Sequence, residues 1–174
     1  GDSELAEEHY RIATSLNPNQ ARAHFNYAVV EFGRGNVIEA ERLLASVLDL
    51  DPAHVEARVD MGRLHEQNGH IQEAIEQYQR ALSDAPNYPP AHFWLGRQLL
   101  RTGDYAKGIE HLEASLEPET SQTAFFTYEL AMSHALLGNL DDARQWLRQA
   151  QAAANRAGQH QLEATIERDL ENIR

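Results

Sequence analysis

The chain has 174 residues, enough for one domain or two small ones, and 42% of them are apolar while 24% are charged. This composition excludes wholesale disorder, the lack of an apolar run near about 18 residues excludes an integral membrane protein, and the absence of cysteine excludes disulfides and thiol chemistry. The net charge of −12 argues against nucleic acid or anionic lipid as a partner, because both attract basic surfaces. The acidic, polar start predicts no signal peptide, and the compartment stays open between cytoplasm and periplasm.

Proline, glycine and small residues recur every 34 positions along the chain. Three series keep this step: Pro18, Pro52 and Pro86; Gly35, Gly69 and Gly103; Ala40, Ala74 and Gly108. Thirty-four residues hold two helices of about 12 to 14 residues and two short turns. The period therefore predicts an array of helix pairs.

The predicted elements follow this period in chain order. They are the second helix of a truncated repeat at 3–18, repeats at 21–54, 55–88, 89–123 and 124–156, and a capping helix at 159–174. In the first full repeat, a helix from Ala21 to Phe32 precedes one from Val37 to Leu50, which ends because Pro52 cannot continue it. After Leu116 the register slips by one residue, with Pro118 two positions early. The half repeat at the start and the cap at the end indicate an array that continued upstream.

Small residues occupy equivalent slots in successive repeats. The first helices carry Ala28, Gly62 and Gly96 in one slot, and the second helices carry Ala40, Ala74 and Gly108 in another. Small side chains let two helix backbones approach closely, while larger neighbours fill the remaining space. We expect Leu44, Tyr78 and Leu112 to be these larger neighbours.

In these slots the sequence resembles the tetratricopeptide repeat (TPR) family. The best match runs Met61-Gly62-x2-His65, then Ala74-x3-Tyr78, then Ala81 and Pro86. The signature tryptophan is absent, and His24, Arg58 and His92 stand in its slot. The resemblance implies an all-α right-handed solenoid, a superhelix of stacked antiparallel helix pairs with a C-terminal capping helix.

The resemblance also implies that partners bind the concave inner face, which the first helix of each repeat lines. Transferring the inner slots gives these candidate partner-binding residues: Phe25, Asn26, Val29, Val59, Arg63, Glu66, Phe93, Trp94, Arg97, Arg101, Tyr128 and Met132. Aromatic side chains where solvent should reach favour a binding surface. The alternative is that several of them pack against neighbouring second helices.

Three arginines occupy inner slots of a strongly acidic chain. Arg63 and Arg97 stand at equivalent positions, and Arg101 follows one turn later. Arginine suits the capture of a carboxylate, so we expect a ligand with apolar anchors and an acidic group. The alternative is local ion pairing, for example between Arg63 and Glu66.

Two ligand-binding arrangements of the family do not fit. A chaperone carboxylate clamp needs basic residues where Glu56 and Asp60 stand, and an asparagine ladder would extend beyond Asn26. No catalytic residue, cofactor or metal site is predicted. His65 and His70 are five residues apart with a glycine between them, whereas a zinc-hydrolase helix needs histidines four apart on one face.

These observations predict a non-catalytic scaffold that binds a peptide or helix of another protein. One alternative is a regulatory or targeting repeat region of a larger enzyme whose catalytic domain lies outside the chain. A further alternative is a homodimer formed through the truncated N-terminal end, where the first helix exposes its inner side with Leu5, Tyr10 and Ile12.

Overall fold

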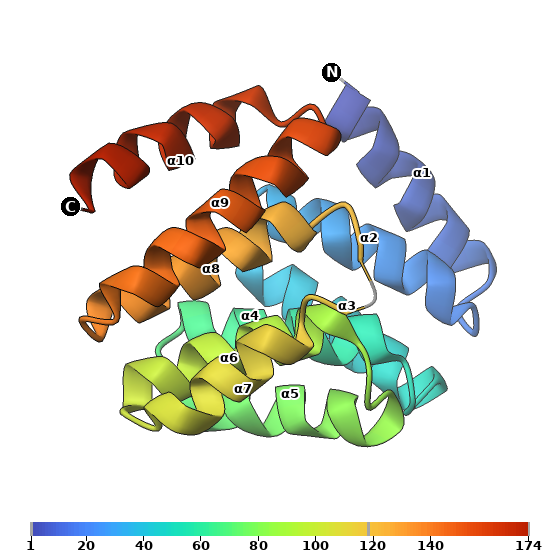
Figure 1. The fold of residues 1–174 in the computed structure, drawn as a ribbon. Coiled ribbons are helices and arrows are strands. Elements are labelled where there is room, and N and C mark those ends of the chain that lie inside the picture. The colour runs from blue at the N-terminus through green and yellow to red at the C-terminus, as the bar shows by residue number, and fades with distance from the viewer. Residues whose placement is uncertain (1, 118, 174) are drawn as a thin grey trace. The chain divides into compact units, whose positions relative to one another are not determined.

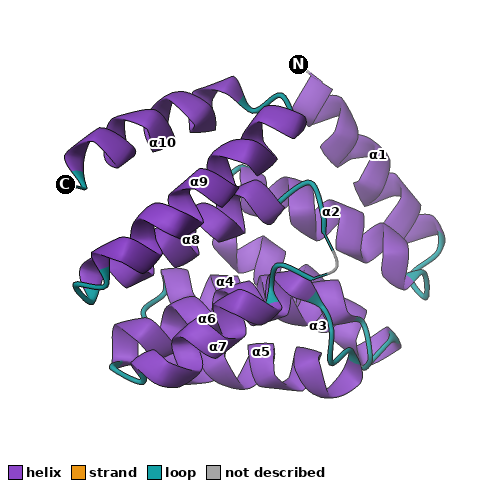
Figure 2. Ribbon diagram, in the orientation of Figure 1, coloured by secondary structure: helices purple, strands orange, loops and turns teal. Residues whose placement is uncertain are grey.

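The computed structural model describes residues 2–117 and 119–173, so Pro118 lies outside the described residues. This part of the chain forms ten helices and no strand (Figures 1 and 2). The helices are α1 (Asp2–Leu16), α2 (Ala21–Gly33), α3 (Val37–Leu50), α4 (Val55–Gln67), α5 (Ile71–Asp84), α6 (Pro89–Thr102), α7 (Tyr105–Ala114), α8 (Thr123–Leu136), α9 (Leu140–Arg156) and α10 (His160–Asn172). They divide into two compact units, an N-terminal unit with α1–α5 and a C-terminal unit with α6–α10.

Tight turns join the two helices of each pair, and a glycine in each turn has a positive φ angle. In the α4–α5 turn the φ angle of Gly69 is 77°, a conformation that a residue with a Cβ atom rarely adopts. The Gly69 N–H donates to the carbonyl of Glu66 at 3.0 Å, and the next N–H donates to that of His65 at 2.8 Å. These bonds satisfy carbonyls that the helix end would leave unpaired.

The N-terminal unit has a core between the members of its helix pairs. Tyr27 from α2, Leu43 and Leu44 from α3, and Met61 and Leu64 from α4 form one buried cluster. Fully burying side chains of this size is worth about 1.5–3 kcal/mol each. The apolar stripes of α2, α3 and α4 therefore hold this unit together.

The C-terminal unit has two core clusters that meet at Trp146. Phe93, Leu112 and Leu130 belong to the cluster that joins α6, α7 and α8. Ile166 belongs to the second cluster, through which α9 and α10 pack together. The long helix α9 runs beside α8 in Figure 1, and its Trp146 contacts both clusters.

The small-residue slots allow the close helix contacts that the sequence predicts. A Cβ atom on Gly96 would lie 2.8 Å from the carbonyl oxygen of Gly108, so the α6 and α7 backbones touch. A Cβ atom on Gly62 would lie 2.4 Å from the ring of Tyr78. Tyr78 and Leu112 are fully buried, as expected of the residues that fill the space.

The three residues in the signature tryptophan slot each make a polar contact within their own unit. The Nε2 atom of His24 lies 2.9 Å from the carbonyl oxygen of Pro18. Arg58 donates to Asp84 at 3.1 Å. The Nδ1 atoms of His92 and His111 lie 2.9 Å apart and join α6 to α7. Polar contacts thus replace the apolar packing of a tryptophan.

Candidate functional site

The predicted inner residues of the N-terminal unit gather on α2 and α4. Phe25 and Asn26 are half-buried, and Val29 is 46% exposed. The Phe25 ring lies against the imidazole of His54, with centroids 4.7 Å apart. His54 caps α4, because its Nδ1 atom accepts the N–H of Ala57 at 3.3 Å. Phe25 and Asn26 line a cavity of about 510 Å³ beside this cap.

Arg63 contacts both Asp60 and Phe32. Together with Phe25, Asn26 and Val29 it belongs to the surface that we call the N-terminal face. Its guanidinium donates to Asp60 at 2.8 Å and lies over the ring of Phe32, 4.7 Å from the centroid. Burial raises the pKa of the Asp60 carboxyl above its usual range, and the Arg63 charge opposes that rise. Glu66 is half-buried one turn along α4. Arg63 thus compensates a carboxylate of its own helix.

Two of the candidate residues are buried, which corrects the expectation that solvent reaches them. Val59 is 4% exposed, and Phe93 is fully buried. Phe93 stacks on Phe126 of the neighbouring helix with centroids 4.2 Å apart and an interplanar angle of 16°. Phe93 is therefore packed between helices, but its stacking partner lies on α8, a first helix, and not on a second helix as the alternative interpretation expected. In the C-terminal unit, the role of Phe93 is to support the accessible side chains around it.

Phe93 supports a set of accessible side chains on α6 and α8, the aromatic face, made of Trp94, Arg97 and Phe125. The rings of Trp94 and Phe125 lie 5.2 and 5.4 Å from that of Phe93. The Arg97 guanidinium lies 5.0 Å from the Trp94 centroid, and its Nε atom lies 3.9 Å from Glu129 in a loose ion pair. Phe125 is 40% exposed, and the candidate set omits it although it stands in an inner slot.

The remaining candidates of the C-terminal unit surround the aromatic face. Arg101 is exposed and contacts the side-chain oxygen of Gln98 at 3.4 Å. Met132 is half-buried on α8. Tyr128 donates to Asp169 of α10 at 2.8 Å, and burial together with this bond raises the pKa of Tyr128 to about 12. Tyr128 therefore anchors the last helix, a role that its slot in the repeat does not reveal.

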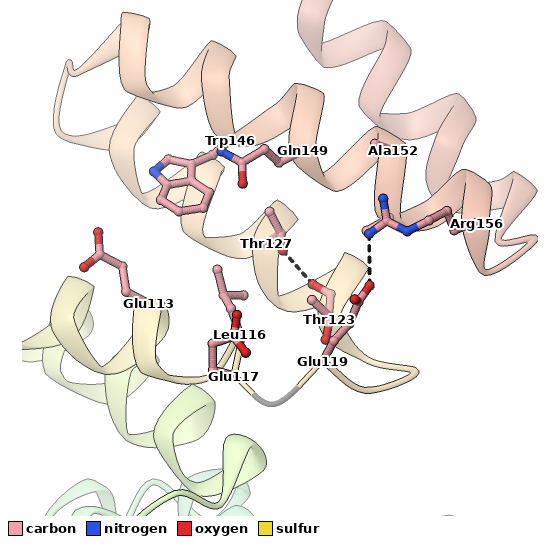
Figure 3. Close-up of a pocket in the computed structure, with 11 residues that line it drawn as sticks. Glu113, Leu116, Glu117, Glu119, Thr123, Thr127, Trp146, Gln149, Ala152 and Arg156 are labelled. Carbon is pink, nitrogen blue, oxygen red and sulfur yellow. Dashed lines mark hydrogen bonds and ion pairs between the residues drawn. The ribbon is translucent and has the colours of Figure 1, made fainter.

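A second cavity lies in the C-terminal unit, and sequence reasoning missed it. It has a volume of about 460 Å³, and Figure 3 shows residues of α7, α8, α9 and the segment after α7 around it. Thr123 and Thr127 line it from the side of α8 away from Phe125. The register slip after Leu116 is the one sequence signal near it. We call it the acidic pocket, since Glu113, Glu117 and Glu119 line it.

The described residues contain neither a metal-binding group nor a membrane-spanning helix. Within residues 2–117 and 119–173, no group of three or more histidine or acidic side chains is placed to hold a metal ion. The rings of His65 and His70 are 6.2 Å apart between centroids. None of the described helices is long and apolar enough to cross a bilayer.

Known proteins share both the sequence pattern and the fold. YpiA, a TPR repeat-containing protein of Bacillus subtilis strain 168, is 24% identical over 151 residues, which are 86% of this chain and 36% of that protein. The chain spans about a third or less of the length of the curated relatives that it matches. TTC0263, a thermophilic TPR protein of Thermus thermophilus, superposes with a TM-score of 0.78 at 18% identity, over 98% of this chain and 90% of that one.

YrrB, a TPR protein described as having an unusual peptide-binding site, superposes with a TM-score of 0.69 at 16% identity, over 96% of this chain and 91% of its own. At such identities the likeness establishes the fold, which is the all-α repeat fold that the sequence predicts. The family described as tetratricopeptide repeat matches residues 1–55, 32–89, 59–124 and 95–158. Repeats of this family are generally scaffolds for protein–protein interaction. The chain belongs to the tetratricopeptide repeat family.

Proposed function

We propose that the chain is a non-catalytic interaction module that binds a peptide or helix of a partner protein on the first helices of its repeats. The observation that carries the proposal is the aromatic face, where Trp94, Arg97 and Phe125 surround the buried ring of Phe93. Tryptophan and arginine are the residues that most often dominate binding energy at protein interfaces. Phe93 holds them in place before binding, which lowers the entropic cost of association.

The partner that suits this face carries an apolar anchor followed by a carboxylate. The accessible parts of Trp94 and Phe125 offer apolar area for the anchor. Arg97 is held by Glu129 only across 3.9 Å, so a partner carboxylate with better geometry can displace Glu129. Arg101, exposed one turn further along α6, adds positive charge on this helix.

The N-terminal face has a different role in this proposal. Arg63 is engaged with Asp60 and Phe32, so its capture of a partner carboxylate would leave the half-buried Asp60 uncompensated. Phe25, Asn26 and the cavity beside them offer apolar contact and amide hydrogen bonds instead. We therefore assign the carboxylate to Arg97 in the C-terminal unit.

A peptide-display selection on the intact chain tests the proposal, followed by affinity measurements on selected peptides. We expect Arg97→Gln to weaken binding about 10-fold and Trp94→Ala to weaken it at least as much, because both remove contacts at the centre of the face. Arg80→Gln is the matched control, since Arg80 is exposed on α5 and its loss changes the net charge equally.

Circular dichroism establishes whether each variant folds. If Trp94→Ala does not fold, Arg97→Gln alone decides the test. Selected peptides that share an acidic, apolar motif and discriminate Arg97→Gln from Arg80→Gln support the proposal. Peptides that bind Arg97→Gln as tightly as the unsubstituted chain contradict it.

A further inference from the structure

The acidic pocket combines an aromatic wall with an excess of carboxylates. Leu116, Trp146 and Ala153 give it apolar lining. In Figure 3, Trp146 and Glu113 lie at one end of the pocket, and the ion pair between Arg156 and Glu119 lies at the other. The indole is half-buried, so part of it remains accessible. A concave site with one flat aromatic wall differs from the solvated acidic surface that the composition alone predicts.

The charge inside the pocket is negative and only partly compensated. Among the described residues that line it, Arg156 is the one basic side chain, and its guanidinium lies 2.9 Å from a carboxylate oxygen of Glu119. Glu113 and Glu117 are exposed, and neither makes a hydrogen bond or ion pair with any side chain in the part of the chain that the structure describes. Two carboxylates therefore remain for an incoming cation. In Figure 3, Glu113 lies at the end where Trp146 lies, and Glu117 lies beside Leu116 in the middle of the pocket.

We propose that the acidic pocket binds the arginine or lysine side chain of a basic segment in a partner polypeptide. The indole of tryptophan is the best aromatic surface for a guanidinium or ammonium group, within about 6 Å of the ring centroid. The aliphatic stem of such a side chain packs on Leu116, while its charged head reaches Glu113 and Glu117. A volume of about 460 Å³ accommodates one long side chain with part of its flanking backbone.

This inference is independent of the aromatic face. The pocket is formed by the end of α7, the segment after it and the face of α9 that carries Trp146 and Arg156. Thr123 and Thr127 complete it, and the period of the helix places them across α8 from Phe125. It selects a basic ligand, whereas the aromatic face selects an acidic one. The two proposals share no residue, so either can fail without the other.

Nuclear magnetic resonance with two short peptides tests the pocket. The probe is acetyl-Gly-Gly-Arg-Gly-Gly-amide, and its neutral counterpart carries citrulline in place of arginine. The reporter is the indole N–H signal of Trp146, identified by its absence in Trp146→Phe. We expect the arginine peptide to shift this signal saturably and with an affinity that falls as salt is added, and the citrulline peptide to leave it in place.

The variant pair Glu113→Gln with Glu117→Gln keeps the shape of the pocket and removes its free charge. We expect it to raise the dissociation constant of the arginine peptide about 5-fold or more. Glu73→Gln with Glu76→Gln on α5 is the matched control, because both residues are exposed and the charge change is equal. No shift with arginine, an equal shift with citrulline, or unchanged affinity in the pocket variant would overturn the proposal.

Discussion

The α4–α5 pair of the N-terminal unit and the α6–α7 pair of the C-terminal unit reach close packing in different ways. In the first pair, the ring of Tyr78 lies on Gly62. In the second, the carbonyl oxygen of Gly108 lies so near Gly96 that the two backbones meet. The same repeat pattern therefore tolerates either a large side chain or a direct backbone contact at one slot. The two pairs therefore differ in what must move when a methyl group is added at the glycine: a side chain in the first pair and backbone in the second.

The two pairs also differ in how they use an arginine at the same slot. Arg63 compensates the half-buried Asp60, so it belongs to the stability of its unit. Arg97 lies over Trp94 and is only loosely paired with Glu129. The position that is structural in one repeat is thus the one that we propose for binding in the next.

The largest expected effect comes from adding a methyl group at the two glycines. Gly96→Ala meets the backbone of α7, which cannot yield locally, and we expect a loss of about 2–3 kcal/mol in unfolding free energy. Gly62→Ala meets a side chain, so Tyr78→Leu should partly relieve it, and the double variant should lose less than the sum of the single ones. Urea unfolding measures both. Equal relief of Gly96→Ala by Leu112→Ala would remove the distinction between the pairs.

Removal of each arginine tests the second difference. Arg63→Ala leaves Asp60 without compensation, and we expect a loss of about 1–2 kcal/mol at pH 7. Arg97→Ala should lose under about 0.5 kcal/mol, because its ion pair is loose and partly exposed. Burial already raises the pKa of Asp60, so the folded state of Arg63→Ala binds a proton more tightly than the unfolded state, and its stability should recover as the pH falls toward 4.

Asn in place of aspartate is the control for this explanation. Asp60→Asn in the Arg63→Ala background should restore stability at pH 7 and abolish the recovery in acid. Thermal unfolding between pH 4 and 7 follows both. A pH-independent loss in Arg63→Ala would attribute the effect to packing on Phe32 instead.

Tyr128 is a residue through which the C-terminal unit fixes its last helix. Tyr128→Phe removes the hydrogen bond to Asp169 and leaves the ring in place, and we expect α10 to lose about 1 kcal/mol of protection. Hydrogen exchange of the α10 amides measures this, with the α4–α5 amides as internal control. Unchanged exchange in α10 would show that the packing of Ile166 and its apolar neighbours is enough to hold the helix without the Tyr128 hydrogen bond.

The smallest effect concerns the histidine pair between α6 and α7. Burial, with the charge of His92, lowers the pKa of His111, so the unfolded state binds its proton more tightly. The stabilisation is complete above about pH 6.5 and is lost as the pH falls through the lowered value, by under about 1 kcal/mol because the ring is partly exposed. Amide exchange in α6–α7 at pH 7 and 5.5, corrected for intrinsic rates, should show this loss and His111→Gln should abolish it.

Much of the fold followed from the 34-residue period, because proline, glycine and small residues act locally on helix ends and contacts. The slots also placed Trp94, Arg97 and Phe25 on the first helices. The slots wrongly predicted that solvent reaches Phe93, because its stacking on Phe126 is a contact between two repeats. The 34-residue period does not predict contacts between repeats, since each slot is defined within one helix pair.

The acidic pocket was beyond sequence reasoning for a different reason. Trp146 and Arg156 lie on one face of α9, while Glu119 lies in the segment where the period slips. A repeat pattern predicts positions that recur, and this site depends on a departure from recurrence. The partner of Tyr128 on the last helix was hidden in the same way, because Asp169 follows the final repeat.

The contact between Gly96 and Gly108 has a consequence for the design of a consensus repeat. At the slot of Gly108 the earlier repeats carry alanine, at Ala40 and Ala74. A Cβ atom on Gly108 would lie 2.7 Å from Leu100, so alanine at this slot is obstructed by a side chain outside the slot. A consensus built by averaging the repeats would therefore place alanine at a slot where this pair has no room for a methyl group unless Leu100 moves.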